Sequence, residues 1–259
     1  MKLVDAHIHF SDAEYLQHTD ELIADARNLG VAALVSNSTD FETSLGTLRL
    51  SEKFPRLVYA ALGIHPWNVN ALKKNELEDT LNLISEQTQR KSVVAIGEIG
   101  LDSKYETAWE KQLDVFDKML RIAERTNLPV IIHSRGTTET ILEMLSSYNL
   151  KGVLLHWFSH PLTALAKAVG RGYLITEGPP AIYSDGIREV VDKVPLTNLL
   201  TETDGPVKYY KQPFSGQLTK PSFVKSVVEA VAEIKRRPIA EVATQIALNF
   251  ENFFNVKLR

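Results

Sequence analysis

Short, continuously apolar runs recur along this chain of 259 residues and alternate with segments of helical periodicity. Eight runs have the length and composition of buried strands, at residues 3–9, 31–37, 57–64, 93–99, 129–133, 153–157, 173–177 and 198–203. Most of them lack the polar–apolar alternation of a strand with one wet face, which favours parallel strands covered on both sides. Between them, stretches 71–89, 105–127 and 137–148 carry apolar residues at helical spacing.

This alternation predicts βα units, and eight such units in one chain are typical of a (β/α)8 TIM barrel of the α/β class. The alternative is a doubly wound open sheet, which usually has fewer strands and offers one crevice instead of a ring of strand ends. No linker, low-complexity tract or change of composition divides the sequence, so we predict one domain over residues 1–259. Residues 222–256 are expected to form two or three helices that cover the barrel.

Histidines and acids stand where these runs end. In a (β/α)8 barrel the chemistry lies at the carboxyl ends of the strands. His7 and His9 are two residues apart, so in a strand both imidazoles would point to one face. One such histidine is more often a core residue bonded to a carbonyl, but convergence from four strands favours a metal site. The candidate ligands are His7, His9, Glu98, His133, His156 and Asp204.

Composition narrows the chemistry and the setting. The chain has no cysteine, which excludes disulfides, thiolate zinc sites and cysteine nucleophiles and leaves histidine and carboxylate as ligands. Its first residues lack the apolar core of a signal peptide, and it has no run of about 20 apolar residues, so we expect a cytoplasmic protein without a membrane partner. No obligate protein partner is evident. The net charge of −3 argues against non-specific binding of duplex DNA, but bound metal ions can supply positive charge locally.

The longest irregular segment, residues 204–221, follows the last predicted strand and is expected to contact substrate. Its cations and aromatics, Lys208, Tyr209, Tyr210 and Lys220, could hold a single strand through phosphates and stacked bases. The alternative is an ordinary solvated loop. Arg135 is a further candidate for phosphate binding.

Two acids near the predicted ligands are further candidates for a role at the site. Glu202 is either a substrate-contacting residue or a satisfied buried acid. Asp5, two residues before His7, could orient a ligand. The glycines around Glu98 are expected to allow close approach of neighbouring backbone.

Six motifs taken together resemble one family. They are Asp5-Ala6-His7-Ile8-His9, Gly63-Ile64-His65-Pro66, Gly97-Glu98-Ile99-Gly100-Leu101-Asp102, Leu128-Pro129-Val130-Ile131-Ile132-His133-Ser134-Arg135, His156-Trp157-Phe158-Ser159 and Glu202-Thr203-Asp204-Gly205-Pro206. In this order they resemble the TatD family of metal-dependent hydrolases, which are deoxyribonucleases within the amidohydrolase superfamily. The resemblance runs from the first strand to the last and extends to Asn249 and Phe253-Phe254.

The resemblance implies a barrel with two divalent ions. It implies that His7, His9, Glu98 and Asp204 surround one ion and that Glu98, His133 and His156 surround the other, with Glu98 bridging. It also implies that His65 contacts substrate and not a primary metal. Sites of this composition accept Mg, Mn, Zn or Ni, so the metal stays open.

Some positions depart from the family pattern. Trp157 and His160 stand where the family usually has a small residue or cysteine and a glycine, and Ser103-Lys104 replaces an aromatic pair. The basic, asparagine-containing turn of the last loop is replaced by residues 217–221. Ligands are thus retained while positions facing the substrate have changed, which supports metal-dependent hydrolysis more strongly than DNA as the substrate.

The expected function is therefore a metal-dependent deoxyribonuclease that cleaves phosphodiester bonds as a 3′–5′ exonuclease. Two ions that share Glu98 would lower the pKa of a water, and Asp204 would accept its proton, so Glu98 and Asp204 are the predicted catalytic residues. Two alternatives stay open. One is a metal-dependent ester or amide hydrolase such as a D-aminoacyl-tRNA deacylase, and the other is a barrel that binds metal without turnover.

Overall fold

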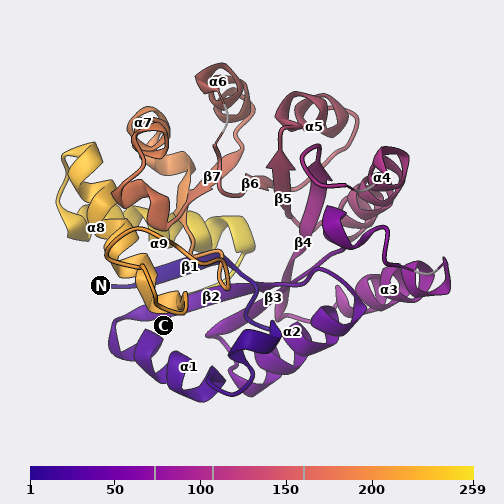
Figure 1. Cartoon of the computed structure of the whole chain (residues 1–259), viewed down its shortest axis with the longest axis horizontal. Coiled ribbons are helices and arrows are strands. Elements are labelled where there is room, and N and C mark those ends of the chain that lie inside the picture. Colours follow the sequence, from indigo (N-terminus) through magenta and orange to yellow (C-terminus); the bar gives the residue numbers. More distant parts are fainter. Residues whose placement is uncertain (73, 107, 160) are drawn as a thin grey trace. The chain divides into compact units, whose positions relative to one another are not determined.

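The computed structural model describes residues 1–72, 74–106, 108–159 and 161–259. His160, one of the departures named above, lies outside the described residues, as do Lys73 and Thr107 inside two predicted helices. Eight described strands form a sheet whose order follows the chain, β1-β2-β3-β4-β5-β6-β7-β8 (Figure 1). They are β1 (Leu3–Ile8), β2 (Val31–Asn37), β3 (Val58–Leu62), β4 (Val93–Asp102), β5 (Val130–Arg135), β6 (Val153–Leu155), β7 (Leu174–Glu177) and β8 (Leu199–Thr201).

Helices alternate with the strands. The α-helices are α1 (Thr19–Asn28), α2 (Phe41–Lys53), α3 (Lys74–Gln87), α4 (Trp109–Thr126), α5 (Thr138–Leu145), α6 (Leu162–Gly170), α7 (Asp185–Lys193), α8 (Val224–Lys235) and α9 (Ile239–Phe254). Short 3-10 helices are η1 (Ala13–Tyr15), η2 (Pro66–Asn68), η3 (Pro179–Ile182), η4 (Leu196–Asn198) and η5 (Pro221–Phe223). Strand followed by helix, eight times, is the order of a (β/α)8 barrel, as predicted. Within the described residues, no helix is long and apolar enough to cross a membrane.

By its internal packing the chain divides into two compact units. The first unit is Met1–Ser36 with Trp157–Arg259, and the second is Asn37–His156. The prediction of one domain over residues 1–259 stays a prediction.

In the first unit, β1 lies against β8 and is covered by α8 and α9. Valines of α8 and Phe250 of α9 are buried. Asn249 of α9 donates its Nδ2 hydrogens to the backbone oxygens of Leu196 and Leu199, each at 2.8 Å. The second and third residues after β8 are held in turn, because the backbone N–H groups of Thr203 and Asp204 donate to Asp5 Oδ1 and to the His7 carbonyl. The carboxyl ends of β1 and β8 therefore meet.

In the second unit, α4 packs on β4, and β4 pairs in parallel with both β3 and β5. Close approach of these strands requires glycine at two positions. A Cβ atom on Gly63 would lie 2.6 Å from the backbone oxygen of Glu98, and one on Gly100, at φ +149°, would lie 2.0 Å from that of His133. The expectation of close backbone approach around Glu98 is confirmed.

The strand predictions are confirmed in number and order, and several ends are corrected. β4 continues to Asp102 because Leu101 and Asp102 pair with Ser134 and Arg135. β3 and β6 end earlier than predicted, at Leu62 and Leu155, and β8 ends at Thr201. His65, His156 and Asp204 therefore lie in the loops that directly follow these strands.

Candidate metal centre

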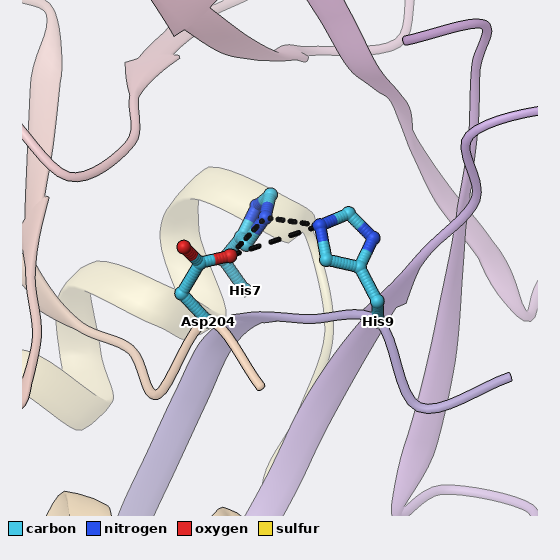
Figure 2. A group of neighbouring side chains, drawn as sticks. All are labelled: His7, His9 and Asp204. Atoms are coloured by element: carbon cyan, nitrogen blue, oxygen red, sulfur yellow. Dashed lines mark hydrogen bonds and ion pairs between the residues drawn. The ribbon is translucent and has the colours of Figure 1, made fainter. Parts of the chain in front are cut away.

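Three predicted ligands of the first unit converge. His7, at the end of β1, is fully buried, and the loops after β1 and β8 add His9 and Asp204. Figure 2 shows their polar atoms pointing toward one another. Asp204 Oδ1 lies 3.3 Å from His7 Nε2 and 3.7 Å from His9 Nε2, and the two Nε2 atoms are 3.3 Å apart. We call these three residues the His7 group.

The backbone around the His7 group is fixed by buried polar contacts. Asp5 Oδ1 accepts the backbone N–H groups of His7 and Thr203 at 3.3 and 3.0 Å, and Thr203 Oγ1 lies 2.6 Å from Asp5 Oδ2. Among the contacts described, Asp5 thus binds the backbone at His7 and at Thr203, next to Asp204, and does not bind an imidazole ring. Burial raises the pKa of Asp5 to about 8. Asp204 has φ +51°, a left-handed conformation that aspartate tolerates better than most residues.

In the second unit, histidines from three strand ends surround one carboxylate. Glu98, 1% exposed on β4, directs Oε1 at His156 Nε2, His133 Nδ1 and His65 Nε2, at 2.7, 3.1 and 3.3 Å. His156 Nε2 and His133 Nδ1 are 3.5 Å apart. We call these four residues the Glu98 group.

The proton on His133 is placed by a residue that the sequence analysis did not select. Asp102, fully buried, accepts at Oδ2 from His133 Nε2 at 2.9 Å and from Trp67 Nε1 at 2.7 Å. Burial raises the pKa of Asp102, but hydrogen bonds from His133, Trp67 and the backbone of Lys104 outweigh it and hold the pKa below its ordinary value. A neutral His133 therefore carries its proton on Nε2 and presents the lone pair of Nδ1 beside Glu98. Asp102 lies four residues after Glu98 in one strand, a spacing that could have indicated a shared face.

His65 has the opposite arrangement. Its Nδ1 accepts the backbone N–H of Trp67 at 3.2 Å, so the proton of the neutral ring lies on Nε2. Nε2 faces Glu98 as a hydrogen-bond donor, and a protonated nitrogen cannot ligate a metal. The expectation that His65 contacts substrate and not a primary metal stays a prediction.

We predict that Asp102→Asn lowers metal affinity about 10- to 100-fold, the effect typical of losing a residue that orients a metal ligand. If the amide nitrogen of the introduced Asn faced His133 and Trp67, its N–H groups would oppose their N–H donors, or His133 would change to the tautomer with its proton on Nδ1. Equilibrium dialysis with metal analysis gives the affinity.

The control for Asp102 is Asp114→Asn, which changes an exposed carboxylate of α4 paired with Lys118. Equal metal affinity in wild type and Asp102→Asn would show that the contact to His133 does not orient a ligand.

The donor sets fit divalent cations. Each group combines imidazole nitrogens with a carboxylate oxygen, the ligands that Zn, Mn, Ni and related ions share. The candidate ligand atoms of His7, His9 and Asp204 lie within 4.8 Å of one another, as do those of His65, Glu98 and His133. The tautomers described above favour His133 over His65 as a metal ligand within the second set. The residues can therefore hold metal, while the number and identity of the ions stay predictions.

The charged candidates for substrate contact lie in different environments. Arg135 is exposed at the end of β5 and forms no ion pair within the part of the chain that the structure describes. Lys208 and Lys220 pair with Glu14 and Asp25, at 3.4 and 2.9 Å. Glu202 is fully buried and accepts a hydrogen bond from Thr176 Oγ1. Their substrate roles stay predictions.

The two tyrosines of the 204–221 loop differ sharply. Tyr210 is 86% exposed, whereas Tyr209 is 5% exposed and packs with Phe214, Phe223 and Trp157. Tyr209 donates its hydroxyl hydrogen to the backbone oxygen of Thr203 at 2.7 Å, and burial raises its pKa well above the ordinary value. In this conformation Tyr209 anchors the loop beside Asp204, and the ring available for stacking is that of Tyr210.

We predict that Tyr209 contributes to stability and that Tyr210 contributes to DNA binding. Tyr209→Phe should lower the free energy of unfolding by about 1–3 kcal/mol because it leaves the buried Thr203 carbonyl without its partner. Tyr210→Ala should change it by less than about 0.5 kcal/mol, yet weaken binding of single-stranded DNA. Urea unfolding and KM values for single-stranded DNA and a small phosphodiester measure both effects.

A Tyr210→Ala loss of equal size on both substrates would place the effect at the metal centre. Unchanged KM values on both would favour a small substrate.

The fold and the two ligand groups define a class, that of (β/α)8 proteins with histidine–carboxylate groups able to hold metal at the carboxyl ends of their strands. Comparison with known proteins narrows it. Residues 4–255 match the family model described as TatD related DNase.

Relatives match over nearly the whole chain. A Methanocaldococcus jannaschii protein named as an uncharacterized metal-dependent hydrolase is 33% identical over 259 residues, 100% of this chain and 99% of its own. Human deoxyribonuclease TATDN3 is 29% identical over 260 residues, 95% of this chain and 93% of its own. The crystal structure of YJJV, a TatD homologue from Escherichia coli, matches with a TM-score of 0.91 at 32% identity, covering 98% of each chain. The chain belongs to the TatD family of metal-dependent hydrolases, and the predicted (β/α)8 fold is confirmed.

Proposed function

We propose that this protein is a divalent-metal-dependent deoxyribonuclease that removes nucleotides from the 3′ ends of accessible DNA. The observation that carries the proposal is the pair of ligand groups, in which every ligand expected from the family is present. Membership of the TatD family and the name of the human relative support DNA as the substrate.

Divalent ions bound to these groups would lower the pKa of a water and offset charge on the reacting phosphate. Asp204, which lies against two imidazoles, is the proposed acceptor of the proton from that water. Glu98 is the proposed shared ligand, a role that the family resemblance implies. His65 Nε2–H is suited to donate a hydrogen bond to a substrate oxygen.

Charge favours an anionic substrate. Two divalent ions carry about +4, whereas Glu98 and Asp204 together contribute −2, so the loaded centre retains positive charge. Arg135, Lys208 and Lys220 are the proposed contacts to flanking phosphates, and Tyr210 is the proposed contact to a base. For the two lysines this requires exchange of the partners Glu14 and Asp25 for phosphate.

The test is turnover of three substrates by the metal-loaded protein. Single-stranded DNA, a D-aminoacyl ester and a simple phosphodiester are each incubated with Mg, Mn and Zn. We expect release of mononucleotides from the 3′ end of DNA at a rate well above that of either small substrate. Turnover confined to the ester would replace the proposal with an ester or amide hydrolase. Metal binding without turnover of any substrate would indicate a non-catalytic barrel.

A further inference from the structure

An exposed aromatic pair adjoins the Glu98 group. Trp67 in η2 and Tyr105 in the loop after β4 are stacked, with ring centroids 5.1 Å apart and planes inclined by 22°. Trp67 is 42% and Tyr105 49% exposed, although both are large aromatic side chains. We call them the aromatic platform. Large apolar rings left in water beside a candidate active site mark a binding surface more often than a packing defect.

Trp67 is held against the ligands by three kinds of contact. Its indole Nε1 donates to Asp102 Oδ2, the oxygen that also accepts from His133. Its backbone N–H donates to His65 Nδ1. Its ring meets those of His65 and His133 edge to face, at centroid distances of 4.8 and 5.8 Å. The Trp67 ring therefore has a fixed position in direct contact with two members of the Glu98 group, His65 and His133.

The loop that carries Tyr105 is tied to the loop that carries Trp67. Asn70, just after η2, donates its Nδ2 hydrogen to the Glu106 carbonyl and accepts at Oδ1 from the backbone of Ala108, both at 3.4 Å. The first turn after β4 is fixed by the backbone N–H of Lys104, which lies 2.7 Å from Asp102 Oδ1. Hydrogen bonds thus hold both loops that carry the aromatic platform, which distinguishes it from a chance contact between two surface side chains.

The surroundings suit a nucleotide. Lys104 lies over Gly136, because a Cβ atom on that glycine would be 3.3 Å from Lys104 Cε. The preceding residue, Arg135, is exposed and pairs in register with Asp102. Two cations therefore accompany a flat aromatic surface, and this combination binds the phosphate and the base of an unpaired nucleotide together.

We propose that Trp67 and Tyr105 form a stacking subsite for one unpaired nucleobase of the strand being cleaved. The inference rests on the proposed nuclease function, since it names the part of the substrate that lies next to the metal centre. Tyr105 supplies the outer ring, and Trp67 fixes the distance of that ring from His65 and His133.

The experiment measures stacking without turnover. The probe is a short single strand with phosphorothioate linkages at its 3′ end and 2-aminopurine placed in turn at each of the last three positions. A matched strand has an abasic residue at the same position. Fluorescence quenching and equilibrium binding are recorded with the metal-loaded protein.

We expect quenching at one of the three positions in the wild-type protein. Tyr105→Ala should abolish that quenching and weaken binding of the base-containing strand about 10-fold, while binding of the matched abasic strand is unchanged. Tyr105→Phe keeps a ring and should bind like the wild type. The control Tyr173→Ala, which removes a tyrosine just before the amino end of β7, should also bind like the wild type.

Binding by Tyr105→Ala that equals the wild type on every strand would overturn the subsite, as would an equal loss on base-containing and abasic strands. The subsite and the nuclease proposal fail separately. DNA hydrolysis that does not depend on Tyr105 removes only the subsite. Quenching that depends on Tyr105, in a protein that hydrolyses no DNA, removes only the nuclease function.

Discussion

Replacement of Glu98 by Gln is expected to abolish hydrolysis and to lower metal content while the chain stays folded. One oxygen of this carboxylate faces three imidazole nitrogens at 2.7–3.3 Å, so its charge is the common partner of the Glu98 group. Gln has nearly the same shape but no charge, and it cannot serve as an anionic ligand. Loss of a residue that only orients a ligand costs about 10- to 100-fold, so loss of the ligand should cost more than about 100-fold in activity.

The measurements for Glu98→Gln are turnover, metal content after dialysis and circular dichroism of the metal-free protein. Glu78→Gln is the matched control, because it makes the same change at an exposed position of α3. Near-normal turnover by Glu98→Gln protein that holds two ions would rule out Glu98 as the essential shared ligand.

Asp204→Asn should lose rate more severely than it loses metal. Asn tolerates the left-handed backbone of Asp204, and its side-chain oxygen can still face His7 and His9. An amide cannot accept the proton of an attacking water, and general-base catalysis typically contributes 10²–10⁴-fold. We therefore expect a rate loss of about that size, with most of the metal retained.

The pH profile separates the two roles of Asp204. If Asp204 is the base, the variant loses the limb of the profile that reports deprotonation of the base in the wild type. Asp185→Asn, an exposed change at the start of α7, controls for the loss of a carboxylate. An unchanged rate and pH profile would remove Asp204 from the proposed role and leave it as a ligand only.

Much of the fold could be predicted from local sequence. Parallel strands buried on both faces need apolar side chains at every position, so runs such as Val130-Ile131-Ile132 are unambiguous. Strand ends were predicted less well, because hydrogen-bonding partners from a neighbouring strand decide them. The continuation of β4 to Asp102 depends on Ser134 and Arg135, which lie more than 30 residues away in sequence.

The candidate substrate contacts in the 204–221 loop were even harder to predict from local sequence. Tyr209 and Tyr210 are adjacent residues of the same type. Packing with Phe214 and Phe223 buries Tyr209, whereas Tyr210 is exposed to water. The pairing of Lys208 with Glu14 and of Lys220 with Asp25 likewise joins residues distant in sequence.

The sequence by itself determined the fold class, the candidate metal ligands and the family, because each depends on residue type within a strand or just after its end. Only the tertiary structure indicates which nitrogen of each neutral ring carries the proton. The nitrogen of His133 that faces Glu98 is set by Asp102, and the nitrogen of His65 that does so is set by the backbone of Trp67. The reason is physical: either nitrogen of a neutral imidazole can carry the proton, and the hydrogen bond made by one decides what the other can do.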